Sequence, residues 1–230
     1  MTLPLSFATV RQLSGLIRSK EVSPLELATF FLSRLETIGP HYNAIVTLTK
    51  ELALEQATTL EQEAKRGEYR SILHGIPYGA KDLLATAGGI PTTWGASPLR
   101  NQMFDYDATI IKKLQAHGAT LAAKLAMVEL AGGFGYRNPE ASFTGPGITP
   151  WGDIAAWSGG SSSGSGSAVA AGLVPFAIGS ETWGSILTPA NNCGITGLRP
   201  TFGRISRHGA MTLSWSLDKI GPLCHTADDC

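Results

Sequence analysis

The feature that most constrains this chain is a stretch rich in glycine and serine between Gly159 and Ala190. It reads GGSSSGSGSAVAAGLVPFAIGSETWGSILTPA, so two Gly/Ser-rich segments, 159–167 and 179–185, flank a middle part without charge. Glycines allow sharp backbone turns and let backbone N–H groups approach a ligand closely. Hydroxyl groups beside such N–H groups indicate nucleophilic chemistry with a site that stabilises an oxyanion.

The uncharged middle of this stretch predicts a compact helix followed by a strand. Residues Ala168–Ala171 suit a short helix that ends at Gly172. Leu173–Ile178 then has the pattern of a short buried strand, with Pro175 at its start or at an irregular edge. The two serine-bearing segments are therefore expected to form separate loops, joined by this helix and strand.

Two other interpretations of the stretch agree less well with its residues. Gly/Ser-rich segments are often flexible linkers, but a linker would not carry the apolar run from Ala168 to Ile178. A phosphate-binding loop needs a Gly-Lys pair followed by serine or threonine, and no lysine lies between Lys124 and Lys219. Loops that carry a nucleophile remain the better interpretation.

The composition of the chain argues against some classes of partner. Its 230 residues are enough for one domain with a sizeable core, and 18 basic residues balance 18 acidic ones. No net charge therefore recruits nucleic acid or an anionic membrane. Three cysteines are too few for a disulfide framework and favour a reducing, cytoplasmic compartment. We expect neither a secretory signal nor a membrane-spanning segment.

Helical and strand patterns alternate along the chain. Amphipathic or capped segments predict helices over Thr9–Ser19, Ser23–Ile38, Glu51–Arg66 and, capped by Asp107, over Ala108–His117. Apolar runs predict strands over Ala44–Leu48, Thr120–Lys124 and Gly194–Leu198. This alternation predicts a layered α/β fold in one domain, with a helical scaffold in residues 1–67 and the catalytic core in 68–230.

A serine nucleophile needs a base, and histidine is the usual one. None of the five histidines lies in either serine-bearing segment. Lys81 is an alternative base, because burial disfavours the ammonium form of a lysine and lowers its pKa. An apolar surround is offered by its neighbours Ile76, Pro77, Leu83 and Leu84. The plainer alternative is a surface lysine that pairs with Asp82.

Three separated motifs resemble those of the amidase signature family of serine hydrolases. The loop with Ser161 resembles the family's GGSSGG pattern, and Ser185 follows at the matching distance in the segment GSETWGSIL. The family also has a lysine in a GIPxxxKD segment, and residues 75–82 read GIPYGAKD. The resemblance covers almost the whole chain. It implies a layered α/β/α fold with a mixed central sheet, incomplete at the C-terminal end of this chain.

The resemblance implies a catalytic triad of Lys81, Ser161 and Ser185. Neutral Lys81 would accept a proton from Ser161, which follows a cis peptide bond in the family and accepts a proton from Ser185. Ser185 would attack the amide carbonyl and form an acyl-enzyme, which water then hydrolyses. The family also implies an oxyanion site that needs no metal or cofactor and is made by the backbone N–H groups of Thr182, Trp183 and Gly184.

Two positions depart from the family pattern. Trp183 stands where glycine is usual, and Leu187 stands where arginine is usual. A positive φ at tryptophan would be costly, and its indole is a candidate for filling part of the acyl pocket. Leu187 removes a charge that would anchor nearby loops. Because family members continue well beyond the matching segment, this chain resembles an N-terminal portion.

The leading function that the resemblance implies is hydrolysis of a small-molecule carboxamide to an acid and an amine or ammonia. Residues 204–209 and 216–218 also resemble the amidotransferase branch of the family. In that branch a glutamine-hydrolysing subunit works with partner subunits in tRNA-linked synthesis, so partner subunits or a homodimer are expected assemblies. Direct contact with nucleic acid or membrane is not expected. A third interpretation is a non-catalytic remnant that keeps the fold as a binding module.

Overall fold

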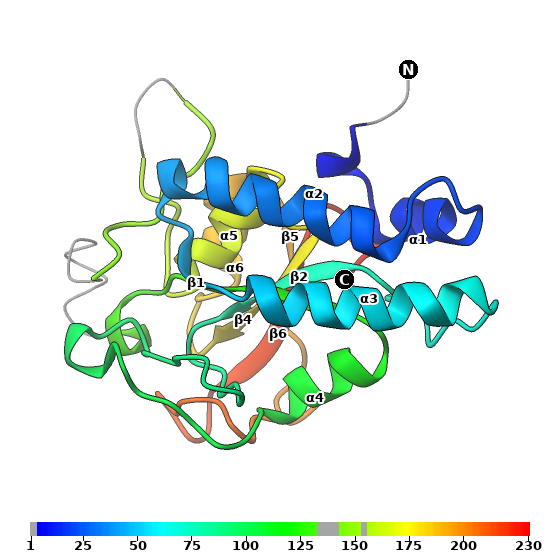
Figure 1. The fold of residues 1–230 in the computed structure, drawn as a ribbon. Helices are drawn as coiled ribbons and strands as arrows, with labels where there is room; N and C mark the ends of the chain where they lie inside the picture. Colours follow the sequence, from blue (N-terminus) through cyan, green and yellow to red (C-terminus); the bar gives the residue numbers. More distant parts are fainter. Residues whose placement is uncertain (1–3, 133–142, 153–155) are drawn as a thin grey trace.

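A six-stranded sheet forms the centre of the computed structural model, which describes residues 4–132, 143–152 and 156–230 (Figure 1). The strands follow one another across the sheet in the order β1-β3-β2-β4-β6-β5. Their bounds are β1 Ile45–Leu48, β2 Pro77–Lys81, β3 Thr120–Leu125, β4 Phe176–Glu181, β5 Thr196–Gly197 and β6 Lys219–Cys224. The strands β3, β2 and β4 are parallel, whereas β1, β5 and β6 pair antiparallel with their neighbours. The sheet is therefore mixed, as expected.

Helices flank the sheet in the described ranges. They are α1 Val10–Arg18, α2 Pro24–Thr37, α3 Lys50–Lys65, α4 Thr109–Ala116, α5 Ser163–Ala170 and α6 Leu187–Cys193. Short 3-10 helices of the described residues cover Leu5–Phe7, Gly39–Tyr42, Ser97–Leu99 and Glu129–Ala131. Figure 1 shows α2 and α3 lying side by side, and these two helices contact each other. Within the described ranges, no helix is long and apolar enough to cross a membrane.

Local capping explains why the first two helices begin where the sequence predicts. Thr9 forms a reciprocal capping box with Gln12 at the start of α1, and Ser23 forms one with Glu26 at the start of α2. The predicted cap of α4 is different. Asp107 Oδ1 accepts from the Ala87 N–H at 2.8 Å, and no side chain caps α4. A contact from a distant loop thus takes the acceptor that a local cap would use.

The Gly/Ser-rich stretch contains less loop than the sequence predicts. Helix α5 begins at Ser163, inside the expected loop 159–167, and strand β4 begins at Phe176 and continues to Glu181. Gly164 allows this, because a Cβ there would lie 2.4 Å from the Ala44 carbonyl oxygen and 2.5 Å from the Ala126 nitrogen. Close packing of small residues against neighbouring backbone therefore makes helix from a segment whose composition favours loop.

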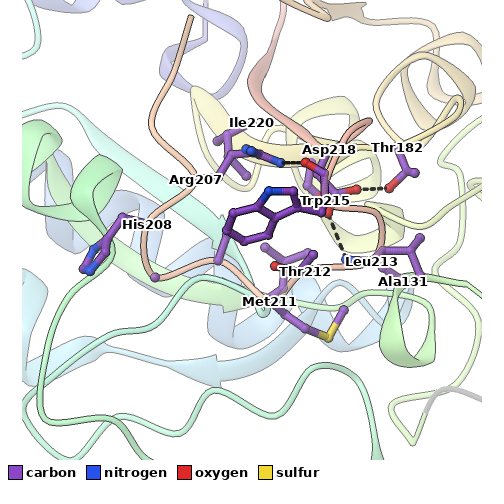
Figure 2. Close-up of a pocket in the computed structure, with 14 residues that line it drawn as sticks. Ala131, Thr182, Arg207, His208, Met211, Thr212, Leu213, Trp215, Asp218 and Ile220 are labelled. Carbon is purple, nitrogen blue, oxygen red and sulfur yellow. Dashed lines mark hydrogen bonds between the residues drawn. The ribbon is translucent and has the colours of Figure 1, made fainter. Parts of the chain in front are cut away.

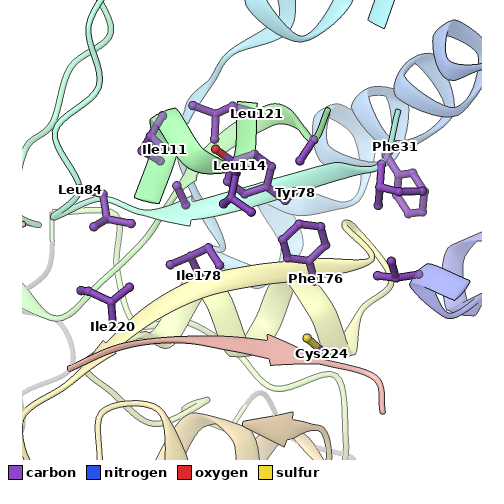
Figure 3. Packing of buried hydrophobic residues seen from close by; sticks show 14 of the residues in the cluster. Phe31, Tyr78, Leu84, Ile111, Leu114, Leu121, Phe176, Ile178, Ile220 and Cys224 are labelled. Atoms are coloured by element: carbon purple, nitrogen blue, oxygen red, sulfur yellow. The ribbon is translucent and has the colours of Figure 1, made fainter. Parts of the chain in front are cut away.

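The core occupies both faces of the sheet. Tyr78 and Phe176 are register partners on adjacent strands, and their rings stack at 5.4 Å between centroids on the face that α4 covers (Figure 3). Ala177, which follows Phe176, belongs to a second cluster with residues of α5 and α6. Successive strand residues point to opposite faces. The helices therefore form layers on both sides of the sheet, in agreement with the expected α/β/α architecture.

The topology brings two strand ends to one edge of the sheet. Because β2 and β4 are parallel, with Ala80 opposite Ile178, both strands end at the same edge. Lys81 is the last residue of β2, and Ser180 and Glu181 are the last residues of β4. Ligand sites of α/β sheets commonly lie at such carboxyl ends.

Candidate active site

The amine of Lys81 is buried among three serine hydroxyls. Nζ lies 2.7 Å from Ser161 Oγ, 3.0 Å from Ser162 Oγ and 2.8 Å from Ser180 Oγ. The side chain is fully buried. Burial lowers the pKa of Lys81 well below its usual value, although two nearby carboxylates act in the opposite direction. The neutral amine is thus favoured, and a neutral amine can accept a proton.

The hydroxyl of Ser162 restricts the orientation of this amine. Ser162 Oγ donates to the Ser180 carbonyl at 3.2 Å and accepts from the Ser180 N–H at 3.3 Å. Because its only hydrogen is committed, this hydroxyl can only accept from Lys81. A neutral amine has two N–H bonds and one lone pair, so one of the other two hydroxyls must donate to the lone pair. Ser161, the closest of the three, is suited to this role.

Ser161 lies in a tightly packed turn just before α5. The Gly160–Ser161 peptide bond is cis. The Val128 N–H donates to the Ser161 carbonyl at 3.0 Å, and a Cβ on Gly160 would lie 2.5 Å from Val128 Cγ2. The turn that presents Ser161 is therefore held by the segment that follows β3, and it needs glycine at position 160.

Ser185 lies between β4 and α6 and is 3% exposed. The Ser162 N–H donates to the Ser185 carbonyl at 3.2 Å. This bond joins the two serine-bearing segments, which are distant in sequence. The structure thus places Ser185 beside the turn that contains Ser161, and Ser162 contacts both the amine of Lys81 and the backbone of Ser185.

A buried carboxylate supports the segment around Ser185. Glu181 is fully buried, and its Oε2 accepts from the backbone N–H groups of Ile186 and Leu187, both at 2.9 Å. Arg199 lies 3.6 Å from the other carboxylate oxygen. The guanidinium of Arg199 therefore supplies a positive charge here, next to Leu187, the position at which the sequence was expected to lack an anchoring charge. The Leu187 side chain is 44% exposed.

The three expected oxyanion residues follow β4 directly. The left-handed backbone conformation falls on Gly184, at φ +92°, and not on Trp183, so the tryptophan causes none of the expected strain. Trp183 is 90% exposed and is not part of the wall of the cavity that Ser180 and Thr182 line. This differs from the idea that it fills an acyl pocket. Among the described residues, the N–H groups of Trp183 and Gly184 meet no acceptor.

Asp82 does not pair with Lys81, although the two are sequence neighbours. Asp82 Oδ1 lies 3.3 Å from Lys124 Nζ, and both side chains are fully buried. Oδ2 accepts from the Thr93 N–H at 2.9 Å and from its hydroxyl. Burial raises the pKa of Asp82 and lowers that of Lys124, while the charge of each partner opposes the shift. The surface lysine paired with Asp82 is therefore excluded.

The histidine nearest to Lys81 in sequence belongs to the scaffold. His74 is buried, its Nε2 lies 2.9 Å from the Leu60 carbonyl, and its Nδ1 accepts from the Arg70 N–H at 3.2 Å. Burial lowers the pKa of His74. Its hydrogen bonds with α3 and the following loop occupy both ring nitrogens, so His74 serves packing here.

Sequence reasoning missed part of this site. Ser162 adjoins Ser161 in the same loop, so its hydroxyl was a visible signal. Ser180 was expected in a loop but lies in β4, and its contact with Lys81 was not predicted. Arg199 was expected to follow a strand, and its contact with Glu181 was not predicted either. Their contacts join positions far apart in sequence, and no local pattern reports such contacts.

The chain matches the family model described as Amidase over residues 26–230. The A subunit of a glutamyl-tRNA(Gln) amidotransferase from Thioalkalivibrio sulfidiphilus is 44% identical over 96% of this chain and 45% of that protein. A putative amidase, AmiD, of Mycobacterium bovis is 40% identical over 95% of this chain and 44% of that protein. The chain thus spans less than half the length of these curated relatives.

Solved structures agree with this match. An amidase family protein of Bacillus anthracis superposes with a TM-score of 0.86 at 37% identity, over 96% of this chain and 45% of that one. The peptide amidase of Stenotrophomonas maltophilia superposes with a TM-score of 0.83 at 31% identity, over 98% of this chain and 47% of that one. Sequence motifs, fold and the family match over most of the chain agree, and the chain belongs to the amidase family.

Proposed function

We propose that this chain carries the catalytic machinery of an amidase that cleaves the C–N bond of a small-molecule carboxamide. The observation that carries the proposal is the buried amine of Lys81, whose three close partners are hydroxyls and not carboxylates. A carboxylate partner would hold the lysine charged, whereas hydroxyls and burial favour the neutral base. A buried neutral lysine beside two serine-bearing turns is suited to activating a hydroxyl nucleophile.

The proposed reaction begins with two proton transfers. Ser185 gives its hydroxyl proton to Ser161 Oγ while the Ser161 proton moves to Lys81 Nζ. The Ser185 oxygen attacks the carbonyl carbon and forms a tetrahedral adduct. The adduct collapses as the C–N bond breaks, and the proton returns through Ser161 to the leaving nitrogen. Water then attacks the acyl-enzyme by the same proton route and releases the acid, which restores all three residues.

The developing negative charge needs hydrogen-bond donors. The backbone N–H groups of Thr182, Trp183 and Gly184 are proposed to supply them. Support comes from the Trp183 and Gly184 N–H groups, which meet no acceptor among the residues that the structure describes. Donors that are held in place before the reaction stabilise an oxyanion without reorganisation. The Glu181 contacts with Ile186 and Leu187 fix the backbone that follows.

A serine-reactive fluorophosphonate tests the nucleophile in the protein expressed from its complete reading frame. We expect labelling of Ser185, loss of labelling in Ser185→Ala and a strong decrease in Lys81→Ala. The control is Ser97→Ala, which alters a serine of an exposed 3-10 helix and should label normally. Peptide mapping that finds the adduct on another serine refutes the assignment, and a folded protein without any adduct supports the non-catalytic remnant.

A second candidate is the glutaminase component of a tRNA-dependent amidotransferase. It is favoured by the Thioalkalivibrio sulfidiphilus relative, an amidotransferase component that is 44% identical to this chain. Partner subunits would then complete the assembly. Release of ammonia from glutamine that requires co-expressed partner subunits supports this candidate, whereas hydrolysis of simple amides by the isolated protein supports a free-standing amidase.

A further inference from the structure

A cavity of about 390 Å³ opens beside the candidate active site (Figure 2). Two of its lining residues connect it to the chemistry: Ser180, whose hydroxyl contacts Lys81 Nζ at 2.8 Å, and Thr182, the first of the proposed oxyanion donors. Much of the remaining wall is apolar and is formed by Leu83, Ala131, Met211, Leu213, Trp215 and Ile220. A group attached to a carbonyl at this site can therefore extend into a partly apolar space.

One lining residue, Arg207, brings a positive charge that has no carboxylate counter-ion among the described residues. The guanidinium carbon of Arg207 lies 5.3 Å from the ring centroid of Trp215 and 4.6 Å from that of Phe202. One of its nitrogens donates to the Trp215 carbonyl. Among the described residues, no carboxylate lies within ion-pair distance of Arg207. The aromatic rings and the carbonyl position this cation and leave other guanidinium N–H groups for a ligand.

The acidic residue in the same wall is already occupied by the protein. Asp218 Oδ1 accepts from the Thr182 hydroxyl and the Ser214 N–H, and Oδ2 accepts from the Leu213 and Ser214 N–H groups. It is 8% exposed. The carboxylate therefore braces the loop 213–218 against the end of β4 and does not offer a site for a cationic ligand. Neutral donors do not cancel the charge of Asp218, but they occupy its oxygens, so Arg207 is the charged group of this wall that keeps hydrogen-bonding capacity for a ligand.

We propose that this cavity selects amides that carry a carboxylate, with Arg207 binding the carboxylate and the apolar wall contacting the chain that links it to the scissile carbonyl. The inference rests on the proposed amidase function and names the substrate class. A guanidinium binds a carboxylate through two parallel N–H···O bonds, which fixes direction as well as charge. A partly apolar cavity strengthens such a contact, because water screens it less. Arg207 is then a specificity-determining residue that does not take part in the proton transfers.

The test compares adipic acid monoamide with its methyl ester, which has nearly the same shape but no charge. The measurement is kcat/KM for each amide in the protein expressed from its complete reading frame. We expect the wild type to prefer the acid by about tenfold or more in kcat/KM. Arg207→Met should lose most of that preference, while its kcat/KM for the amide bond of the methyl ester should stay close to that of the wild type. Arg207→Lys, which keeps the charge without the planar fork, should retain part of it.

Arg204→Met is the matched control, because it removes a positive charge from the same loop outside the cavity wall, and it should keep the preference. Equal kcat/KM for the two amides in the wild type, or an equal fall for both in Arg207→Met, would overturn the inference while leaving amide hydrolysis intact. Preference for a phosphonate analogue over the carboxylate would overturn the carboxylate assignment. Absence of hydrolysis of either amide, together with no labelling of Ser185, would instead remove the proposed function itself.

Discussion

The amine of Lys81 lies where water does not reach it, and this burial decides its charge. A charged amine in the same place would need a counter-ion, but its close partners are the hydroxyls of Ser161, Ser162 and Ser180. The hydroxyl of Ser162 accepts from the amine and donates to the Ser180 carbonyl, so the direction of its hydrogen bonds is set. At this scale, burial beside neutral hydroxyls favours the neutral amine, which is the form that the proposed base requires.

The pH dependence of activity follows from the lowered pKa of Lys81. In the proposed mechanism the neutral amine is the active form, so kcat/KM should rise as the pH passes the pKa in the folded protein and should level off above it. That rise should occur below the pH range in which an exposed lysine loses its proton, since burial moves the pKa downward from its usual value. Arginine stays protonated throughout this range, so Lys81→Arg should lose about 10²–10⁴-fold in kcat/KM.

Lys81→Met is the control for folding, because it removes the amine without burying a fixed charge. We expect it to be folded by circular dichroism and as inactive as Lys81→Arg. Near-normal turnover of the arginine variant with the wild-type pH profile would show that Lys81 is not the base.

At the scale of elements, the neighbouring side chains of Lys81 and Asp82, at the end of β2, point in opposite directions. Lys81 reaches the turn before α5, whereas Asp82 reaches Lys124 on β3 and Thr93 in the following loop. Alternation along an extended chain separates the two residues in this way. The buried pair thereby ties two strands and a loop together, on the side away from the proposed base.

Removal of one partner of the buried pair should be costly. Asp82→Ala leaves the Lys124 amine buried without a counter-ion and should lower the free energy of unfolding by about 3–5 kcal/mol. The double variant Asp82→Asn with Lys124→Met removes both charges and keeps an acceptor for Thr93. Its free energy of unfolding should therefore fall much less than that of Asp82→Ala. Urea denaturation measures both.

The exposed pair of Lys50 and Glu36, at 3.2 Å, is the matched control for this comparison. Glu36→Ala should change the free energy of unfolding by no more than about 1 kcal/mol, because water screens both charges. If Asp82→Ala costs no more than Glu36→Ala, the buried pair does not stabilise the elements as described.

At the scale of the whole molecule, the site depends on how closely α5 packs on the sheet. Gly164, one turn after Ser161, faces the backbone of Ala44 before β1 and of Ala126 after β3. Its N–H donates to the Ala126 carbonyl at 2.8 Å. The same segment holds Ser161 through the Val128 N–H. The distance between the helix layer and the sheet is therefore set by a position without a side chain.

Two glycines within helices provide a test of this close packing. Gly164→Ala places a Cβ 2.4 Å from a backbone oxygen and should lower the free energy of unfolding by about 3 kcal/mol, together with activity. In Gly15→Ala, in α1, the added Cβ meets nothing within 4 Å. This variant should raise the free energy of unfolding by about 0.5–1 kcal/mol, because alanine favours helix. Denaturation of both variants decides the matter, and equal effects at the two positions would contradict the packing argument.

The sequence by itself determined the features that depend on near neighbours or on an extended motif. The capping residue of α2 lies within one turn of the groups it binds, so the cap at Ser23 was readable directly, as was the start of α1 near Thr9. The resemblance covers three motifs and predicted a mixed α/β/α fold, which the structure has. It also proposed Lys81, Ser161 and Ser185 as the catalytic residues. It also led to the cis bond before Ser161, which the structure contains.

Only the tertiary structure decided which atoms meet. The sequence suggested an apolar surround for Lys81, but hydroxyls from α5's leading turn and from β4 surround its amine, and β6 was not predicted at all. It left Asp82 as a possible partner of Lys81, yet Asp82 binds Lys124. It allowed the Trp183 indole to fill a pocket, yet the ring is 90% exposed. The reason is physical: local pattern reports helix, strand and turn preference, whereas burial, charge state and partner choice arise from contacts between strands and layers that lie far apart in the chain.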